Sequence, residues 1–138
     1  MRKTVTIFAA TAFAVTLASG TASATPGSGV TGTILAQKTI GHTDYTLREI
    51  TVQPGGYTGW HFHDGTLYAY VKSGTLTHNL ADCSIDGIFG TGRAFTEKPD
   101  QVHIGRNLGS TPLVLEVLYV LPAGSPLSED APDPGCGF

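Results

Sequence analysis

Two histidines end the segment Gly55-Gly56-Tyr57-Thr58-Gly59-Trp60-His61-Phe62-His63, and a third, His103, follows forty residues later. Side chains alternate along a β-strand, so histidines two residues apart project from the same face. A third imidazole arriving from another strand would complete a pocket of three nitrogen ligands that leaves coordination positions open. The spacing therefore predicts a site for one divalent transition metal, with His61, His63 and His103 as its ligands.

The segments around this motif have the pattern of short strands. Runs rich in Val, Ile, Leu, Tyr and Thr recur at roughly ten-residue spacing, and turns of Gly, Pro and Asp separate them. The clearest runs are residues 45–52, 60–63, 67–71, 75–77, 101–104 and 113–121. The mature chain has no stretch with the period of a helix, and the sequence contains 18 glycines. We therefore expect an all-β sandwich or barrel in a single domain.

The first 24 residues have the three parts of a secretory signal peptide. Met1-Arg2-Lys3 is cationic, the run from Val5 to Leu17 is uncharged and apolar, and Ala22-Ser23-Ala24 offers small residues for cleavage. This pattern predicts a secreted protein whose mature chain is residues 25–138, with no later apolar run long enough to span a bilayer. Residues 25–32 are rich in Pro, Gly, Ser and Thr, which is typical of a flexible leader.

The charge balance of the mature chain gives no reason to expect nucleic acid as a partner. Six basic residues remain against eleven acidic ones once Arg2 and Lys3 are removed. The chain contains no cluster of Lys and Arg of the kind that binds phosphate backbones. A small-molecule ligand or substrate is the expected partner, on the grounds of the predicted histidine pocket.

Cys83 and Cys136 are the two cysteines, and both lie in the exported part of the chain. An even number of cysteines in an oxidising compartment favours a disulfide. It would hold the Pro- and Gly-rich tail, residues 123–138, against the domain, and closing a loop of about fifty residues would contribute about 3–4 kcal/mol. Metal ligation by the two thiols is the weaker alternative, because neither has a second ligand nearby in the sequence.

The histidine segment resembles the first sequence motif of the cupin superfamily. That motif runs from Gly through five residues to His-x-His, then to a Glu and a closing Gly. Gly55, His61, His63 and Gly74 match it, whereas Leu67 stands where the family places its glutamate ligand. The second cupin motif is matched by Gly92, Pro99, His103 and Asn107, with Asp100 in place of a second glycine. Aspartate tolerates the left-handed backbone conformation, so this turn is expected to form.

The resemblance implies a small single-domain cupin, with a jelly-roll-like β-barrel over residues 33–122 and the metal ligands pointing into it. It does not select a reaction, because cupins include dioxygenases, isomerases, decarboxylases, storage proteins and sensors. Sites of three histidines occur in cupin dioxygenases, so oxygen-dependent or Lewis-acid chemistry is the expectation if the chain is an enzyme. The metal is expected to be one of Fe, Zn, Mn, Ni or Cu.

The absence of the usual glutamate would leave the metal with three neutral ligands and its full charge. Glu97 and Glu116 are the two carboxylates that could replace it; the safer interpretation places Glu116, on an otherwise apolar strand, at an outward position. His42 and His78 are interpreted as solvated surface residues, with a role for His78 beside the ligands as the alternative.

The alternation of the strands also places the neighbouring side chains. Trp60 and Phe62 are expected to point away from the metal, and Tyr68 and Tyr70 outward, where they would serve a homodimer interface of the kind that cupins form. Leu67 and Ala69 are expected to face inward, which would make the pocket apolar and suited to a hydrophobic ligand.

Three hypotheses about function remain open at this point. The first is a secreted mononuclear metal-binding cupin enzyme, for which no catalytic acid or base can be named. The second is a non-catalytic module that binds a small ligand or a metal. The third is a structural cupin without metal, although three buried imidazoles would then need other hydrogen-bond partners.

Overall fold

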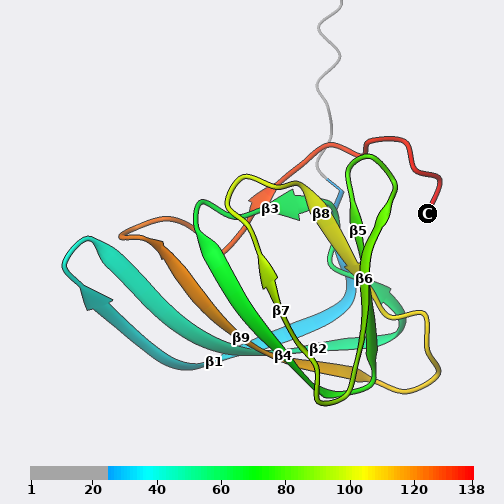
Figure 1. Ribbon diagram of the computed structural model, residues 1–138, viewed down its shortest axis with the longest axis horizontal. Coiled ribbons are helices and arrows are strands. Elements are labelled where there is room, and N and C mark those ends of the chain that lie inside the picture. Colours follow the sequence, from blue (N-terminus) through cyan, green and yellow to red (C-terminus); the bar gives the residue numbers. More distant parts are fainter. Residues whose placement is uncertain (1–24) are drawn as a thin grey trace, which may run out of the picture.

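The computed structural model describes residues 25–138, in which ten β-strands and no α-helix are found (Figure 1). The strands are β1 (Ser28–Ile40), β2 (Thr43–Tyr57), β3 (His61–Phe62), β4 (Thr66–Ser73), β5 (Thr75–Leu80), β6 (Ile85–Gly90), β7 (Ala94–Glu97), β8 (His103–Arg106), β9 (Leu113–Pro122) and β10 (Glu129–Asp130). Residues 25–138 thus offer no helix that could cross a membrane. The predicted signal peptide, residues 1–24, lies outside the described residues.

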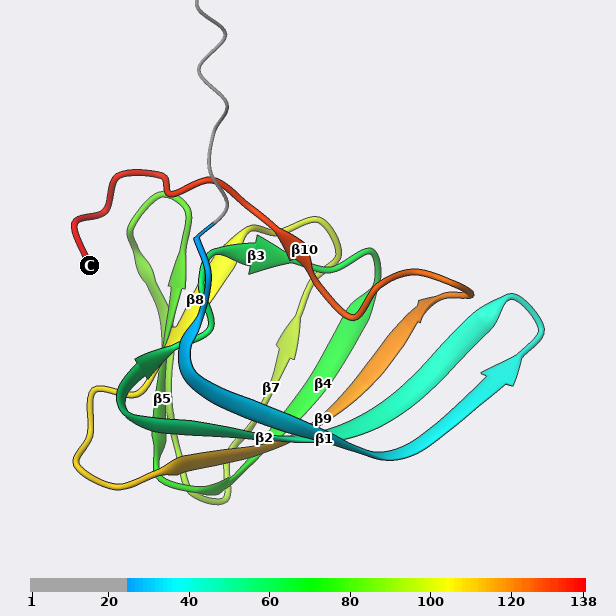
Figure 2. The same ribbon diagram turned by 180° about the vertical axis from the view of Figure 1, so that it is seen from behind.

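The strands form one sheet that curls into a nearly closed barrel (Figures 1 and 2). β9 lies between β2 and β4, and β7 extends this wall on the far side of β4. The other wall is built from β5 and β6 together with β8, which also pairs with β2 and β3. Every pairing is antiparallel. Because residues 25–138 contain only strands, which curl into one nearly closed sheet, the predicted all-β barrel is confirmed.

The inner face of the barrel holds the main hydrophobic core. β9 alternates strictly between buried and half-exposed residues, with Leu113, Leu115, Val117, Tyr119 and Leu121 turned inward. Leu67 and Ala69 of β4 face this core, as the alternation predicted, and Tyr68 and Tyr70 between and after them are 54% and 46% exposed.

Two strands are longer than the sequence indicated. β1 begins at Ser28, so residues 28–32 form a strand paired with β2, where a flexible leader was expected. β2 continues through Gln53-Pro54-Gly55-Gly56, where a turn was expected to end it. The irregular register around Ser28 and Val30 shows how the paired strand accommodates the prolyl and glycyl residues.

The two turns that flank the metal-motif strands adopt the left-handed backbone conformation. Gly74 has φ of 81°, and a side chain there would collide with the backbone of Pro112 and Leu113, so only glycine fits. Asp100 has φ of 58°, as expected for the residue that replaces glycine in the second motif. Its amide donates a hydrogen bond of 2.9 Å to the His63 carbonyl, which ties this turn to the first motif.

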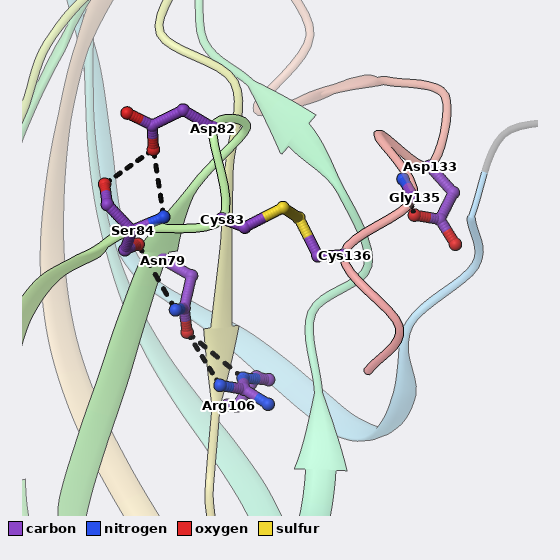
Figure 3. Close-up of a disulfide and its surroundings, with 8 residues drawn as sticks. All are labelled: Asn79, Asp82, Cys83, Ser84, Arg106, Asp133, Gly135 and Cys136. Carbon is purple, nitrogen blue, oxygen red and sulfur yellow. Dashed lines mark hydrogen bonds between the residues drawn. A yellow bond between two sulfur atoms is a disulfide. The ribbon is translucent and has the colours of Figure 1, made fainter.

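The C-terminal segment closes one end of the barrel, where Cys83 and Cys136 form the predicted disulfide (Figure 3). Figure 3 shows Cys83 in the turn between β5 and β6, beside Asp82 and Ser84, with Cys136 reaching it from the tail. Nearby, β10 pairs with β3, and Trp60 is buried in a second small core with Ile104 and Ala131. The tail therefore covers the outer side of the histidine strand, and Trp60 points away from the site as predicted.

Candidate metal centre

The structure brings the three predicted ligands together inside the barrel. His61 is on β3 and His63 follows it, while His103 begins β8 and is the cross-strand partner of His61. The ring centroids are separated by 4.4 Å for His61 and His103, 4.9 Å for His61 and His63, and 5.2 Å for His63 and His103. Each imidazole offers one nitrogen, and these three nitrogens lie within 4.8 Å of one another.

Backbone carbonyls fix the orientation of all three rings. The Nδ1 of His61 donates to Gly59 O at 2.9 Å, that of His63 to Leu127 O at 2.7 Å, and that of His103 to Gln101 O at 2.7 Å. A carbonyl can only accept, so each neutral ring carries its proton on Nδ1 and has a free lone pair on Nε2. This is the tautomer that a metal ligand bonded through Nε2 requires.

A carboxylate lies at the same place, although the sequence motif lacks one. Glu97 Oε2 is 3.2 Å from His63 Nε2 and 3.4 Å from His103 Nε2, and the side chain is only 13% exposed. Glu97 is the cross-strand partner of Leu67, the position at which cupins carry their glutamate. Glu97, one of the two carboxylates that the sequence offered in place of the missing glutamate, therefore lies beside the three histidines.

His78 is also part of this cluster, contrary to the expectation of a solvated surface position. It is 2% exposed, and its Nε2 lies 3.5 Å from Glu97 Oε1. Its Nδ1 donates to Asp86 Oδ2 at 3.0 Å. Asp86 therefore fixes the ring of His78 beside Glu97 and His103, with 4.7 Å between the His78 and His103 ring centroids. His78, Glu97 and His103 form a second group able to hold a metal.

Three buried imidazole nitrogens of this cluster make no hydrogen bond. His63 Nε2, His78 Nε2 and His103 Nε2 are all buried and all lack a hydrogen-bond partner, although carboxylate oxygens lie nearby. Lone pairs therefore face carboxylate oxygens with nothing positive between them. Such an arrangement is costly in a protein interior unless a cation or protons balance it. Nitrogen and oxygen donors of this kind fit a divalent transition metal.

Burial and the mutual proximity of these groups shift their ionisation. Burial, together with the nearby His103 and His63, lowers the pKa of His61 to about 3. Burial acts to raise the pKa of Glu97, but the adjacent imidazoles of His103, His63 and His78, which can donate to the carboxylate once protonated, outweigh it and hold the pKa well below its usual value. An ionised Glu97 beside a neutral His61 is the protonation state that favours metal binding.

The remaining sequence candidates lie outside the cluster. Glu116 faces the outer surface, with Oε2 at 3.6 Å from Lys72 Nζ, as the outward interpretation predicted. His42 is exposed in the turn between β1 and β2. Asn107 of the second motif is fully buried and serves the backbone, since its Nδ2 donates to Val52 O and to Thr111 O at 2.9 and 2.8 Å.

Two small cavities open beside the histidines. The inner one, of about 40 Å³, is mostly apolar and shares His61 and His63 with side chains that include Leu67, Phe95 and Leu115. The outer one, of about 110 Å³, is lined by His61 and His63 as well, and also by Arg48, Tyr119 and Asp130. The predicted inward position of Leu67 therefore contributes to an apolar wall next to the ligand atoms.

Comparisons with known proteins agree with this architecture. The cupin domain family (Cupin_2) matches residues 48–121, which is more than half of the chain. The polyketide cyclase RemF from Streptomyces resistomycificus is 22% identical, with a TM-score of 0.60 over 80% of this chain and 79% of its own. No curated protein matches the chain.

Two further solved structures show the same fold. The cupin-2 domain Rru_A2000 from Rhodospirillum rubrum is 17% identical, with a TM-score of 0.61 over 75% of this chain and 66% of its own. The cupin domain bp2299 from Bordetella pertussis Tohama I is 22% identical, with a TM-score of 0.56 over 70% of this chain and 95% of its own. Identities at this level show the fold and leave the reaction open. The chain belongs to the cupin family, as a small single-domain member with a group of histidines and a glutamate able to bind a metal.

Proposed function

We propose that this protein is a secreted, mononuclear metal-binding cupin that acts on a small organic molecule. The proposed ligands are His61, His63 and His103 through Nε2 and Glu97 through Oε2. When bound, a divalent transition metal would supply Lewis acidity or access to oxygen chemistry at this position. The chain's own residues hold the ligand atoms in place, exclude bulk water with Leu67, Phe95 and Leu115, and offer space on one side of the histidines.

One observation carries this proposal. The imidazoles of His61, His63 and His103 are turned by backbone carbonyls so that unprotonated Nε2 atoms converge beside a buried carboxylate. A metal-free structural cupin would have no use for this arrangement, because it leaves buried lone pairs without donors.

The proposed carboxylate changes the expected electronic character of the site. With Glu97 included, the ligand set carries one negative charge, so a divalent metal retains less positive charge than with three histidines alone. Such a site would be a weaker Lewis acid than one of three neutral histidines alone. Oxygen-dependent conversion and Lewis-acid catalysis both remain compatible with three nitrogens and one oxygen as donors.

Elemental analysis of the exported protein, purified without a histidine tag, tests the proposal. We expect about one equivalent of a single metal per chain, lost in His61→Ala, His103→Ala and Glu97→Gln. His42→Ala is the matched control, because His42 is an exposed histidine outside the cluster, and it should retain the metal. Metal that is absent from the wild type and not taken up when Fe, Zn, Mn, Ni or Cu is added would overturn the proposal.

The size of the cavities supports a second candidate, a module that binds a ligand or a metal without turnover. Cavities of about 40 and 110 Å³ are small beside the pockets of roughly 300–1,000 Å³ that hold drug-sized ligands. Oxygen-uptake and substrate-depletion assays with loaded protein separate the two candidates. Turnover that disappears in Glu97→Gln supports the enzyme, and metal binding with no turnover of any small organic acid or diketone supports the module.

A further inference from the structure

An arginine occupies the inner face of the barrel at the outer cavity. Along β2 the side chains of Thr46, Ile50 and Val52 are buried, and Arg48 has the same parity. Inward positions of a small barrel are normally apolar. Arg48 instead lines the cavity of about 110 Å³ that also reaches His61 and His63.

The Arg48 guanidinium has no carboxylate partner within residues 25–138. The ion pairs in this part of the chain join Lys72 to Glu49 and Glu116, and histidines to Asp86 and Glu97; none involves Arg48. Asp130 lines the same cavity but forms no ion pair with Arg48. A half-buried guanidinium without a counterion is unusual, since such charges are normally paired.

The surrounding residues hold the guanidinium in one place. Gly32 on β1 lies against it so closely that a Cβ at this position would overlap Nη2, Nε and Cζ of Arg48. On the other side is Tyr119 of β9: burial raises the pKa of its phenol, and the nearby Arg48 partly offsets that rise. The absence of a side chain at Gly32 thus leaves room for Arg48 to occupy the cavity wall.

We propose that Arg48 binds the carboxylate of a small organic acid whose apolar end lies towards the histidine and glutamate cluster. This inference rests on the proposed function for the location of the reacting end, and adds the chemical class of the substrate. Guanidinium presents a planar set of donors that matches a carboxylate. The apolar inner cavity beside Leu67 and Phe95 would receive the remainder of the molecule.

Titration calorimetry with propionate and its neutral analogue propionamide tests this assignment. Each is titrated into metal-free and into zinc-loaded protein, because a carboxylate could also bind zinc directly. We expect wild-type protein to prefer propionate in both forms, and Arg48→Gln to lose about ten- to hundredfold of that affinity in both. Arg93→Gln, which removes an exposed arginine outside both cavities, is the matched control and should bind like wild type.

A second variant tests the same point without removing the charge. Gly32→Ala has no left-handed backbone to strain, but its methyl group would push the guanidinium out of its place. It should weaken propionate binding while the zinc content stays at one equivalent. Asp130→Asn should strengthen propionate binding, because it removes the negative charge from the same cavity.

The outcomes separate this inference from the proposed function. Propionate that binds Arg48→Gln as tightly as wild type in both forms overturns the inference, whatever the zinc content. Binding that needs zinc and ignores Arg48 assigns the carboxylate to the metal and also overturns it. A wild-type protein that takes up no metal but still distinguishes propionate from propionamide through Arg48 supports the inference and overturns the proposed metal site.

Discussion

The long strands of this barrel supply its hydrophobic core, whereas the short strands carry the proposed ligands. β2, β4 and β9 have 15, 8 and 10 residues, and their inner faces supply most of the main core. β3, β7 and β8 have 2, 4 and 4 residues, and all four proposed ligands lie on or next to them. Strands this short form few ladder hydrogen bonds, so other parts of the chain must hold the site in position.

The C-terminal segment provides much of that support. β10 pairs with β3, Ala131 N donates to Trp60 O at 2.9 Å, and Leu127 O accepts from His63 Nδ1. The disulfide then joins this segment to the turn after β5 (Figure 3). Burial of side chains on the long strands stabilises the fold, whereas the contacts of the C-terminal segment hold the site in position. Experiments can separate these two contributions.

Removal of the disulfide should give the largest effect. A Cys83→Ser, Cys136→Ser double variant loses a link across 53 residues, and we expect a loss of about 4 kcal/mol in the free energy of unfolding. It should also weaken zinc binding under native conditions, because the tail carries the carbonyl that orients His63. Guanidinium denaturation and zinc titration measure the two effects; unchanged zinc affinity would contradict the proposed role of the tail.

Truncation of a core side chain on a long strand should lower stability without weakening zinc binding. Leu113 on β9 is fully buried and lines neither cavity, so Leu113→Ala should cost about 3 kcal/mol of stability through lost packing. Its zinc stoichiometry and affinity should remain those of wild type below the unfolding transition. A parallel loss of zinc affinity would show that core packing and site geometry are coupled after all.

Acid should destabilise the metal-free protein. The folded pKa of His61 is about 3 against an ordinary value of 6.5, so between these values the unfolded chain binds a proton that the folded chain does not. Stability therefore falls as the pH falls through this window, by up to about 1.4 kcal/mol per pH unit for this group. Glu97 acts in the same direction at lower pH, because its folded pKa is lowered.

Denaturation of metal-free wild type and His61→Ala at pH 7, 6 and 5 measures this dependence. The variant should show the shallower slope because it lacks the group that binds the extra proton on unfolding. Equal slopes in the two proteins would mean that His61 keeps an ordinary pKa in the fold.

The smallest expected effect concerns the support of Glu97. Asp86→Asn removes the charged acceptor for His78 Nδ1, and through His78 it loosens Glu97. We expect zinc affinity to fall about tenfold, towards the lower end of the range for residues that orient metal ligands. Asp82→Asn, in the adjacent turn but without contact to His78, is the control and should bind zinc like wild type.

Local spacing was enough to predict part of this site. The His61 and His63 pair, the outward Tyr68 and Tyr70, and the inward Leu67 all follow from alternation along single strands. The disulfide followed from the number of cysteines and the predicted export. Each of these predictions needed only the spacing of neighbouring residues or the number of cysteines.

The sequence offered Glu97 and Glu116 as possible carboxylates, but the choice between them and the place of His78 depend on pairings that a single sequence does not display. Glu97 reaches the cluster because β7 aligns it with Leu67 across thirty residues of chain. His78 could not be placed by alternation, because Leu76, Thr77, His78 and Asn79 are all buried and β5 therefore has no solvent face. The one available signal was Asp86, an acidic residue eight positions after His78 in the next strand, where a hairpin brings the two together.

Main-chain carbonyls orient His61, His63 and His103, which makes the ring geometry less dependent on the side chains around it. No substitution can delete a carbonyl, so side-chain changes at Gln101 or Leu127 leave these acceptors intact. Gly59 is the exception, because its φ is 80° and a Cβ there would collide with the Thr25 carbonyl, which would force the loop to move. His78 lacks this protection, because its acceptor is the side chain of Asp86. Over evolutionary time, the ligand histidines should therefore keep their ring orientation while the support behind Glu97 is free to diversify.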